Sequence, residues 1–287
     1  MIQWNWQSPE ALKYGIVSIS VANIRRLSVF QSELVNQTLM GTIVQILDER
    51  DEFYYIRNWD DYTGWVSKLS LTVVDEDGAR EWWESEKVMV TENYGIVRSS
   101  PDATGEILTD LVPCVELKYL RTVNNFHQVE LPDGRIGFLT EKIVRREAEQ
   151  HSLQVSSQFI VETARSFLGI PYLWGGTSAK GFDCSGFVQT VFRLLNIQLP
   201  RDTGPMSRKG SEIQPIDPSH LQTGDLIFFG KALNRINHVA IYLGNGQYIH
   251  AYGRVRINSM IPGDVLYNER LHKLMVKAVR ISESFQT

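Results

Sequence analysis

A cysteine and two histidines are the side chains in this sequence best suited to covalent chemistry. Cys184 stands where the glycine-rich loop 175–181 runs into the amphipathic pattern of residues 183–195. We therefore expect Cys184 in the first turn of a helix, on its apolar face. Unpaired backbone N–H groups at such a position favour the thiolate over the thiol. A small residue of the hydrophobic core is the alternative interpretation of the same pattern.

His238 and His250 flank a predicted hairpin turn, the Gly–Asn–Gly sequence at 244–246. If the turn is centred on its asparagine, His250 pairs with Ala240, and both histidines point to one side of the sheet, roughly 7–8 Å apart. A turn centred half a residue earlier would place them on opposite sides. One imidazole could then take the proton of the Cys184 thiol while the second holds the ring of the first.

Zinc binding is a competing use of one cysteine and two histidines. However, the sequence contains no short ligand pair such as Cys-x-x-Cys, and no fourth ligand is evident. We therefore expect a site without a metal ion or another cofactor.

The composition is that of an ordinary globular protein. The chain has 287 residues, which is long enough for two or three domains. Its net charge of −4 disfavours nucleic acid as a partner. No apolar run has the length of a membrane span. The N-terminus lacks the features of a signal peptide, so we expect a cytoplasmic location. We also expect a monomer. A periplasmic or secreted location is the alternative if a signal was removed.

Residues 13–74 read as short strands and turns, and the pattern recurs after a connector, residues 75–87, that could hold a helical turn. The corresponding positions lie 73 residues apart at each of four points: Ile24–Arg25 and Val97–Arg98, Phe53 and Phe126, Ile56 and Val129, Gly64–Trp65–Val66 and Gly137–Phe138–Leu139. A constant offset indicates a duplicated module. Frequent turns suggest that each module is a small all-β barrel.

The periodicity changes after residue 148. Two helical patterns, 157–168 and 183–195, precede a buried strand at 226–229, the histidine hairpin and a last strand at 276–281. Helices followed by an antiparallel sheet predict an α+β domain. The expected boundaries are 1–76 and 77–148 for the two β modules and 149–287 for the α+β domain.

Both parts resemble known families. The repeats are similar to bacterial SH3-like (SH3b) modules in their early Ile/Val–Arg pair and their final Gly–aromatic–Val/Leu. The resemblance implies recognition of cell-wall peptide or positioning of a catalytic domain, and a simple spacer is the alternative. Residues 157–281 resemble the papain-like NlpC/P60 peptidases through five ordered motifs: Tyr172–Leu173–Trp174–Gly175–Gly176, Asp183–Cys184–Ser185–Gly186, Gly224–Asp225–Leu226–Ile227–Phe228–Phe229, His238–Val239–Ala240–Ile241–Tyr242 and His250.

The resemblance implies a thiol peptidase that cuts peptidoglycan stem peptides between γ-D-glutamate and a diamino acid, meso-diaminopimelate or L-lysine. With SH3b-like modules ahead of it, the chain looks like the γ-D-glutamyl-L-diamino acid endopeptidases, which act on peptides with a free N-terminal L-alanine in murein peptide recycling. By this resemblance Cys184 is the nucleophile, His238 is the base, His250 orients the base, and the hydroxyl of Tyr172 helps to hold the oxyanion.

The same resemblance implies a substrate pocket beside the cysteine. Its expected lining is Asp183, Ser185, Arg201, Asp202 and Trp174. A free substrate amine needs a carboxylate such as that of Asp202, and a substrate carboxylate needs a cation or N–H donors.

In the first module, Glu33 and Tyr62 are candidates to close the amine pocket, although a solvated turn explains both equally well. Two other functions are compatible with the sequence. One is a non-catalytic cell-wall-binding protein, and the other is a thiol amidase or acyltransferase on another substrate.

Overall fold

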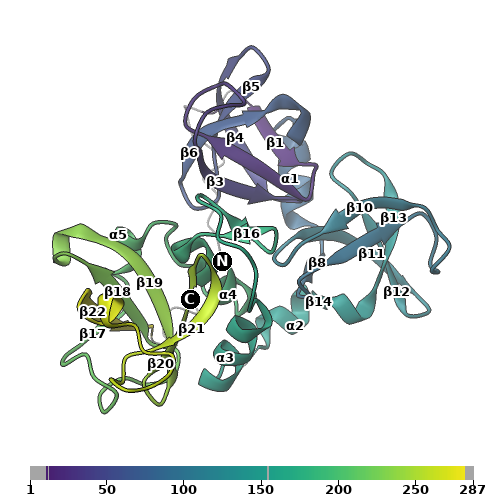
Figure 1. The fold of residues 1–287 in the computed structure, drawn as a ribbon. Helices are drawn as coiled ribbons and strands as arrows, with labels where there is room; N and C mark the ends of the chain where they lie inside the picture. The colour runs from purple at the N-terminus through teal and green to yellow at the C-terminus, as the bar shows by residue number, and fades with distance from the viewer. Residues whose placement is uncertain (1–10, 12, 154, 282–287) are drawn as a thin grey trace. The chain divides into compact units, whose positions relative to one another are not determined.

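The computed structural model describes residue 11, residues 13–153 and residues 155–281, and it divides the chain into two compact units, Met1–Ser152 and Leu153–Thr287 (Figure 1). We describe each unit by itself. The first ten residues, on which the expectation about a signal peptide depends, lie outside the described part of the chain. Within that part, no helix combines the length and the apolar character needed to cross a membrane.

The first unit contains two seven-stranded antiparallel sheets with the same strand order (Figure 1). The first sheet, in the order β3-β2-β6-β5-β4-β1-β7, consists of β1 (Lys13–Val17), β2 (Val21–Arg25), β3 (Leu34–Leu39), β4 (Ile43–Arg50), β5 (Phe53–Arg57), β6 (Thr63–Ser67) and β7 (Leu71–Val74). The second, in the order β10-β9-β13-β12-β11-β8-β14, consists of β8 (Lys87–Val90), β9 (Gly95–Arg98), β10 (Ile107–Leu111), β11 (Glu116–Val123), β12 (Phe126–Glu130), β13 (Ile136–Thr140) and β14 (Val144–Arg146).

The 73-residue repeat of the sequence is therefore a repeat of structure. It extends to single hydrogen bonds. Arg25 Nη1 donates to the carbonyl oxygen of Ser32 at 2.7 Å, and Arg98 Nη1 donates to that of Gly105 at 2.7 Å. Each arginine ties the end of its strand to the loop that follows. The duplicated Ile/Val–Arg pair thus has the same structural role in both sheets.

The connector between the sheets forms a nine-residue helix, α1 (Glu76–Glu84), rather than a single turn. Asp75 caps it, because its carboxylate accepts a hydrogen bond from the backbone N–H of Gly78. Ala79 and Trp82 are buried in a cluster with residues of the first sheet, and Trp82 Nε1 donates to the carbonyl oxygen of Gly41 at 2.8 Å. By its packing, α1 belongs with the first sheet.

The second unit is an α+β domain, as predicted. Its six-stranded antiparallel sheet has the order β17-β22-β18-β19-β20-β21. The strands are β17 (Ser211–Ile213), β18 (Leu226–Gly230), β19 (Ile236–Gly244), β20 (Gln247–Tyr252), β21 (Arg254–Ser259) and β22 (Met275–Arg280), and a separate pair is formed by β15 (Thr177–Ser178) and β16 (Gly181–Phe182).

The α-helices after α1 are α2 (Glu147–His151), α3 (Ser157–Ser166), α4 (Cys184–Leu194), α5 (Thr203–Met206) and α6 (Glu269–His272), and the short 3-10 helices are η1 (Lys68–Ser70), η2 (Glu141–Ile143) and η3 (Leu233–Arg235). In the chain, α3, α4 and α5 precede the six-stranded sheet, and α6 lies between its strands β21 and β22. Ser156 caps α3, whose chain turns away at Gly169 with a φ of +90°. The rings of Phe167, Phe182 and Phe187 meet edge to face in the core below α4.

Candidate active site

The site is built around the first turn of α4, which Asp183 caps. The Asp183 carboxylate accepts a hydrogen bond from the backbone N–H of Gly186 at 2.7 Å. A Cβ atom on Gly186 would lie only 2.1 Å from the carbonyl oxygen of Gly176, so the helix start packs directly on the glycine loop. Cys184 is the first residue of the helix and is 8 % exposed. The predicted junction of loop, helix and cysteine is confirmed.

Three of the predicted pocket residues form one buried network beside Cys184. The guanidinium of Arg201 makes a two-pronged ion pair with Asp183, with distances of 3.0 Å and 2.5 Å, and also donates to Ser185 Oγ at 2.8 Å. The second carboxylate oxygen of Asp183 accepts a bond from the backbone N–H of Gly175 at 3.0 Å. Asp183 therefore links the helix start, the glycine loop and Arg201 into one rigid frame.

The hairpin brings the two histidines together. Ile241 pairs with Ile249 and Tyr242 with Tyr248, which is the register of a turn centred on Asn245. His238 and His250 consequently share one side of the sheet, with Nε2 of His238 2.7 Å from Nδ1 of His250. The parity inferred from the sequence is confirmed.

A third polar side chain extends the pair. Nε2 of His250 lies 3.0 Å from Oδ1 of Asn258, and Nδ2 of Asn258 donates to the carbonyl oxygen of Leu266 at 2.8 Å. Because the amide nitrogen is taken by Leu266, the oxygen must face His250, so Nε2 of His250 carries its proton. Nδ1 of His250 then accepts from Nε2–H of His238. This network leaves Nδ1 of His238 as a free proton acceptor.

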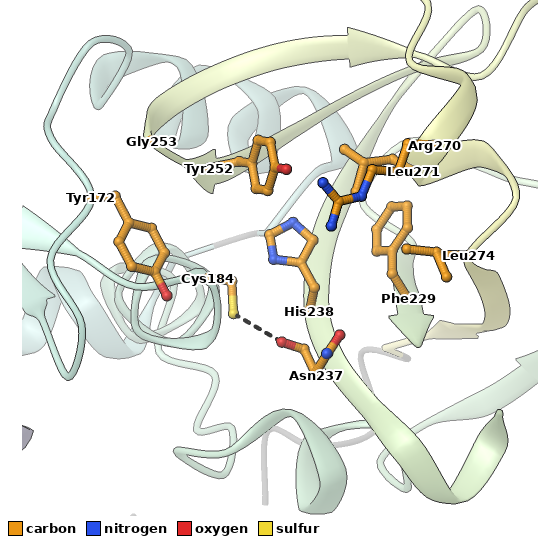
Figure 2. Close-up of a pocket in the computed structure, with 10 residues that line it drawn as sticks. All are labelled: Tyr172, Cys184, Phe229, Asn237, His238, Tyr252, Gly253, Arg270, Leu271 and Leu274. Atoms are coloured by element: carbon orange, nitrogen blue, oxygen red, sulfur yellow. Dashed lines mark hydrogen bonds between the residues drawn. The ribbon is translucent and has the colours of Figure 1, made fainter. Parts of the chain in front are cut away.

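A β-bulge sets the position of His238. In the pairing of β18 with β19, Phe229 faces His238 but Gly230 faces Ile236, so Asn237 is an extra residue on its strand. Its carbonyl oxygen turns toward α4 and lies 3.9 Å from Sγ of Cys184 (Figure 2). The bulge thus brings the backbone of β19 into contact with Cys184 at Asn237, the residue before His238.

Cys184 and His238 line a single pocket of about 340 Å³ (Figure 2). Tyr172 and Cys184 lie on one side of the His238 ring, and a mostly apolar wall lies on the other. The complete lining is Tyr172, Cys184, Phe229, Asn237, His238, Tyr252, Gly253, Arg270, Leu271 and Leu274.

Tyr172 reaches the pocket because its loop pairs with the end of the hairpin. Its backbone N–H donates to the carbonyl oxygen of Gly253 at 3.0 Å. Burial, and then electrostatic interactions with the neighbouring Cys184 and Asp183, raise the pKa of the Tyr172 hydroxyl to about 12. The hydroxyl therefore keeps its proton at neutral pH and can donate a hydrogen bond to a developing oxyanion.

The cysteine rests as a thiol, contrary to what the helix N-terminus alone predicts. Burial, and then the negative charge of Asp183, raise the pKa of Cys184 to about 12, whereas Arg201 and the backbone N–H groups of Ser185 and Val239 lower it. The desolvation of a thiolate at this position outweighs the helix dipole. The thiol must therefore lose its proton as it reacts.

The histidines rest as neutral imidazoles. Burial, and then the neighbouring His250, lower the pKa of His238 to about 3, and burial lowers the pKa of His250 to about 4. A neutral His238 with Nδ1 unprotonated is the form that can accept the thiol proton. The site is thus a neutral thiol–imidazole pair.

The other predicted binding residues are spread over the chain. Asp202 precedes α5, is exposed, and its carboxylate has no hydrogen-bond or ion-pair partner among the described residues. Trp174 is 61 % exposed in the glycine loop. In the first unit, Glu33 forms an ion pair with Arg26 at 2.6 Å, and Tyr62 is half-buried in a turn after Asn58.

The sequence interpretation missed Asn258, Asn237 and Arg270. A signal for Asn258 exists, because β20 and β21 form a second hairpin around Gly253 in which His250 pairs with Arg256. Asn258 is two residues further along and so shares the side of His250. Among the residues that the structure describes, no cluster of three or more His, Cys, Asp or Glu could hold a metal ion.

Residues 169–277 match the NlpC/P60 family and residues 20–72 match the bacterial SH3 domain. The second sheet of the first unit lies outside the matched residues. Gamma-D-glutamyl-L-lysine dipeptidyl-peptidase of Bacillus cereus is 32 % identical over 244 residues, which are 80 % of this chain and 71 % of that relative. Dipeptidyl-peptidase 6 of Lysinibacillus sphaericus is 28 % identical over 270 residues, 90 % of this chain and 95 % of that relative.

The crystal structure of an NlpC/P60 family protein from Bacillus cereus superposes with a TM-score of 0.79 at 25 % identity, covering 93 % of this chain and 99 % of that structure. The chain therefore belongs to the NlpC/P60 family of cysteine peptidases and carries a bacterial SH3 domain ahead of its catalytic domain.

Proposed function

We propose that the protein hydrolyses the amide bond between γ-D-glutamate and the following diamino acid in peptidoglycan stem peptides with a free N-terminal L-alanine, and so releases L-Ala-γ-D-Glu. The observation that carries the proposal is the His238–His250–Asn258 chain, which leaves Nδ1 of His238 unprotonated in the pocket of Cys184. The names of the two relatives, a γ-D-glutamyl-L-lysine dipeptidyl-peptidase and a dipeptidyl-peptidase 6, support the choice of bond.

The chemical step starts at the neutral pair. Nδ1 of His238 takes the thiol proton as Sγ of Cys184 forms a bond to the γ-carbonyl carbon. The oxyanion receives hydrogen bonds from the Tyr172 hydroxyl and from N–H groups at the start of α4. His238 then gives its proton to the amide nitrogen as the C–N bond breaks.

Water completes the reaction. With the diamino acid gone, His238 takes a proton from a water molecule, whose oxygen attacks the thioester carbonyl. The C–S bond breaks, the thiol regains its proton, and L-Ala-γ-D-Glu leaves as the free acid. His250 and Asn258 hold the His238 ring throughout, so they act as positioning residues.

The amino-terminal part of the substrate needs a counter-charge. The exposed carboxylate of Asp202, free of partners within the described residues, suits the ammonium group of a free L-alanine. Arg201, Ser185 and Asp183 would form the polar wall beside the γ-D-glutamyl group, with Trp174 at its rim. That Glu33 and Tyr62 help to bind the amine stays a prediction from the sequence.

A need for a free amine has a biological consequence. In intact wall the L-alanine nitrogen is acylated, so intact wall would be a poor substrate. We therefore propose a role in recycling peptides that have already been released from the wall, in the cytoplasm.

A panel of three tripeptides tests this function: L-Ala-γ-D-Glu-L-Lys, its N-acetyl derivative and the α-linked isomer. We expect release of L-Ala-γ-D-Glu from the first and at least about 100-fold lower kcat/KM for the N-acetyl peptide, because a charge-assisted bond to Asp202 is lost and its carboxylate is left unpaired. Asp202→Asn should remove most of that discrimination, whereas Glu212→Gln, an exposed acid on β17, should keep it. Equal cleavage of the blocked peptide would contradict the amine site, and no cleavage of either γ-linked peptide would contradict the function.

A further inference from the structure

Arg270 presents an uncompensated positive charge to the catalytic pocket. It lies on α6, lines the pocket with Leu271 and Leu274, and points its guanidinium toward the His238 side of the cavity (Figure 2). Within the described residues Arg270 makes no hydrogen bond or ion pair. The acidic residue beside it, Glu269, is already bonded to Lys273 at 2.6 Å.

The rest of the pocket offers this charge no partner. None of the ten lining residues is an aspartate or a glutamate, and His238 is neutral at physiological pH. Phe229, Leu271 and Leu274 give the pocket an apolar wall on the side of Arg270, which is itself an exposed residue. A pocket whose fixed charge is a single cation attracts a carboxylate and repels an ammonium group.

The direction of the reaction assigns this wall to one part of the substrate. His238 must protonate the leaving nitrogen, so the amino acid that leaves lies on the His238 side of the sulfur. Figure 2 draws Tyr172 and Cys184 on one side of the imidazole and Arg270, Leu271 and Leu274 on the other. The residue after the scissile bond therefore faces Arg270.

We propose that Arg270 binds a carboxylate of the amino acid that leaves, and that it thereby selects peptides ending at that residue or carrying an acidic diamino acid there. The proposal rests on the proposed function, since it concerns the leaving side of the same bond. Two carboxylates have the required chemistry. One is the α-carboxylate of a C-terminal diamino acid, and the other is the side-chain carboxylate of meso-diaminopimelate, which L-lysine lacks.

Four tripeptides separate these sources. They share L-Ala-γ-D-Glu and end in L-lysine, L-lysine amide, meso-diaminopimelate, or meso-diaminopimelate amidated at its α-carboxyl. The variant is Arg270→Gln, which removes the charge and leaves a shorter polar side chain. The control is Lys273→Gln. It also removes a cation, only three residues along the chain from Arg270, but Lys273 does not line the pocket.

We expect Arg270→Gln to lower kcat/KM by about 10- to 100-fold for peptides whose carboxylate Arg270 holds, mainly through KM, because one charge-assisted bond is lost. Lysine amide should be unaffected, and Lys273→Gln should match the wild type throughout. A loss with free L-lysine assigns the α-carboxylate. A loss with amidated meso-diaminopimelate assigns the side-chain carboxylate. Arg270→Lys should restore part of the preference.

Calorimetric titration of the Cys184→Ala variant with the same peptides measures the preference without turnover. We expect the peptides whose carboxylate Arg270 holds to bind about 10-fold or more tighter than the peptides that lack it, and we expect this ratio to fall to near one when Arg270→Gln is added. Equal affinity for all four peptides with Arg270 intact would overturn the proposal, as would an equal loss for all four peptides in Arg270→Gln. Failure of the enzyme to cleave any of the peptides would count against the proposed function alone, since the binding ratio is read separately.

Discussion

Arg201 should hold the start of α4 in place, and Arg201→Met tests this directly. The side chains of Arg201 and Asp183 are 3 % and 11 % exposed, and the pair is joined by two bonds, with a third from Arg201 to Ser185. After the substitution the Asp183 carboxylate keeps the backbone N–H groups of Gly175 and Gly186 and a long hydrogen bond of 3.4 Å from Ser185 Oγ, all of them uncharged donors. A buried carboxylate then remains without its counter-charge.

The magnitude follows from the burial. Removing one partner of a buried ion pair costs about 3–5 kcal/mol, because the other charge stays desolvated. At about 1.4 kcal/mol for each factor of ten, the free energy of opening α4 should fall enough to speed amide exchange roughly 100- to 4,000-fold. Hydrogen exchange with mass spectrometry over Cys184–Leu194 in the full chain measures this without requiring the two units to unfold together.

The double variant Asp183→Asn/Arg201→Met is the decisive comparison. It removes both charges and keeps an acceptor for the N–H of Gly186, so its exchange should be slower than that of Arg201→Met alone. Lys273 belongs to an exposed ion pair far from α4 in the sequence, so Lys273→Met should leave the amide exchange of α4 unchanged. Exchange of Arg201→Met within about fivefold of the wild type, or no recovery in the double variant, would refute the reasoning.

Three further outcomes are expected. Burial lowers the pKa of His238 to about 3 and that of His250 to about 4, so both imidazoles stay neutral well below pH 7. We therefore expect kcat/KM to stay constant as the pH falls from about 7 through the ordinary histidine pKa of about 6.5. A fall of kcat/KM with a pKa at or above about 6.5 would contradict the neutral pair. Gly186→Ala places a Cβ 2.1 Å from the carbonyl oxygen of Gly176, so calorimetry should show a destabilisation of about 1–3 kcal/mol, and an unchanged Tm would count against the close packing. Asn258→Leu removes the acceptor 3.0 Å from His250, so kcat should fall about 10- to 100-fold with little change in KM, whereas wild-type kinetics would show that the orienting bond is dispensable.

Local patterns in the sequence were sufficient for much of the fold. The alternation on both sides of Asn245 fixed the hairpin register, because a one-residue slip would have moved His238 and His250 to opposite faces. The glycine loop followed by Asp183 and an apolar helix pattern located Cys184, since an N-cap and a helix face are both local features. The 73-residue offset likewise reflects short-range strand and turn spacing, and the structure confirms it.

Features that depend on neighbours distant in the sequence were not predictable. The bulge at Asn237 interrupts the alternation by one residue without a local signature, and it is the bulge that brings its carbonyl to Cys184. The sequence indicated both the helix N-terminus and an apolar face for Cys184, but not which effect prevails, because the degree to which a thiolate would be desolvated depends on neighbours distant in the sequence. Arg270 sits on a four-residue helix that no periodicity reveals.

The two cysteines provide the most direct measurement of the proposed chemistry. Both are buried, but only Cys184 lines the pocket with His238, whereas Cys114 lies in the first unit. With L-Ala-γ-D-Glu-L-Lys as substrate, Cys184→Ala should release no detectable L-Ala-γ-D-Glu, and Cys114→Ala should release it at the wild-type rate. Dipeptide release by Cys184→Ala at a rate comparable to the wild type would contradict a thiol mechanism at this site.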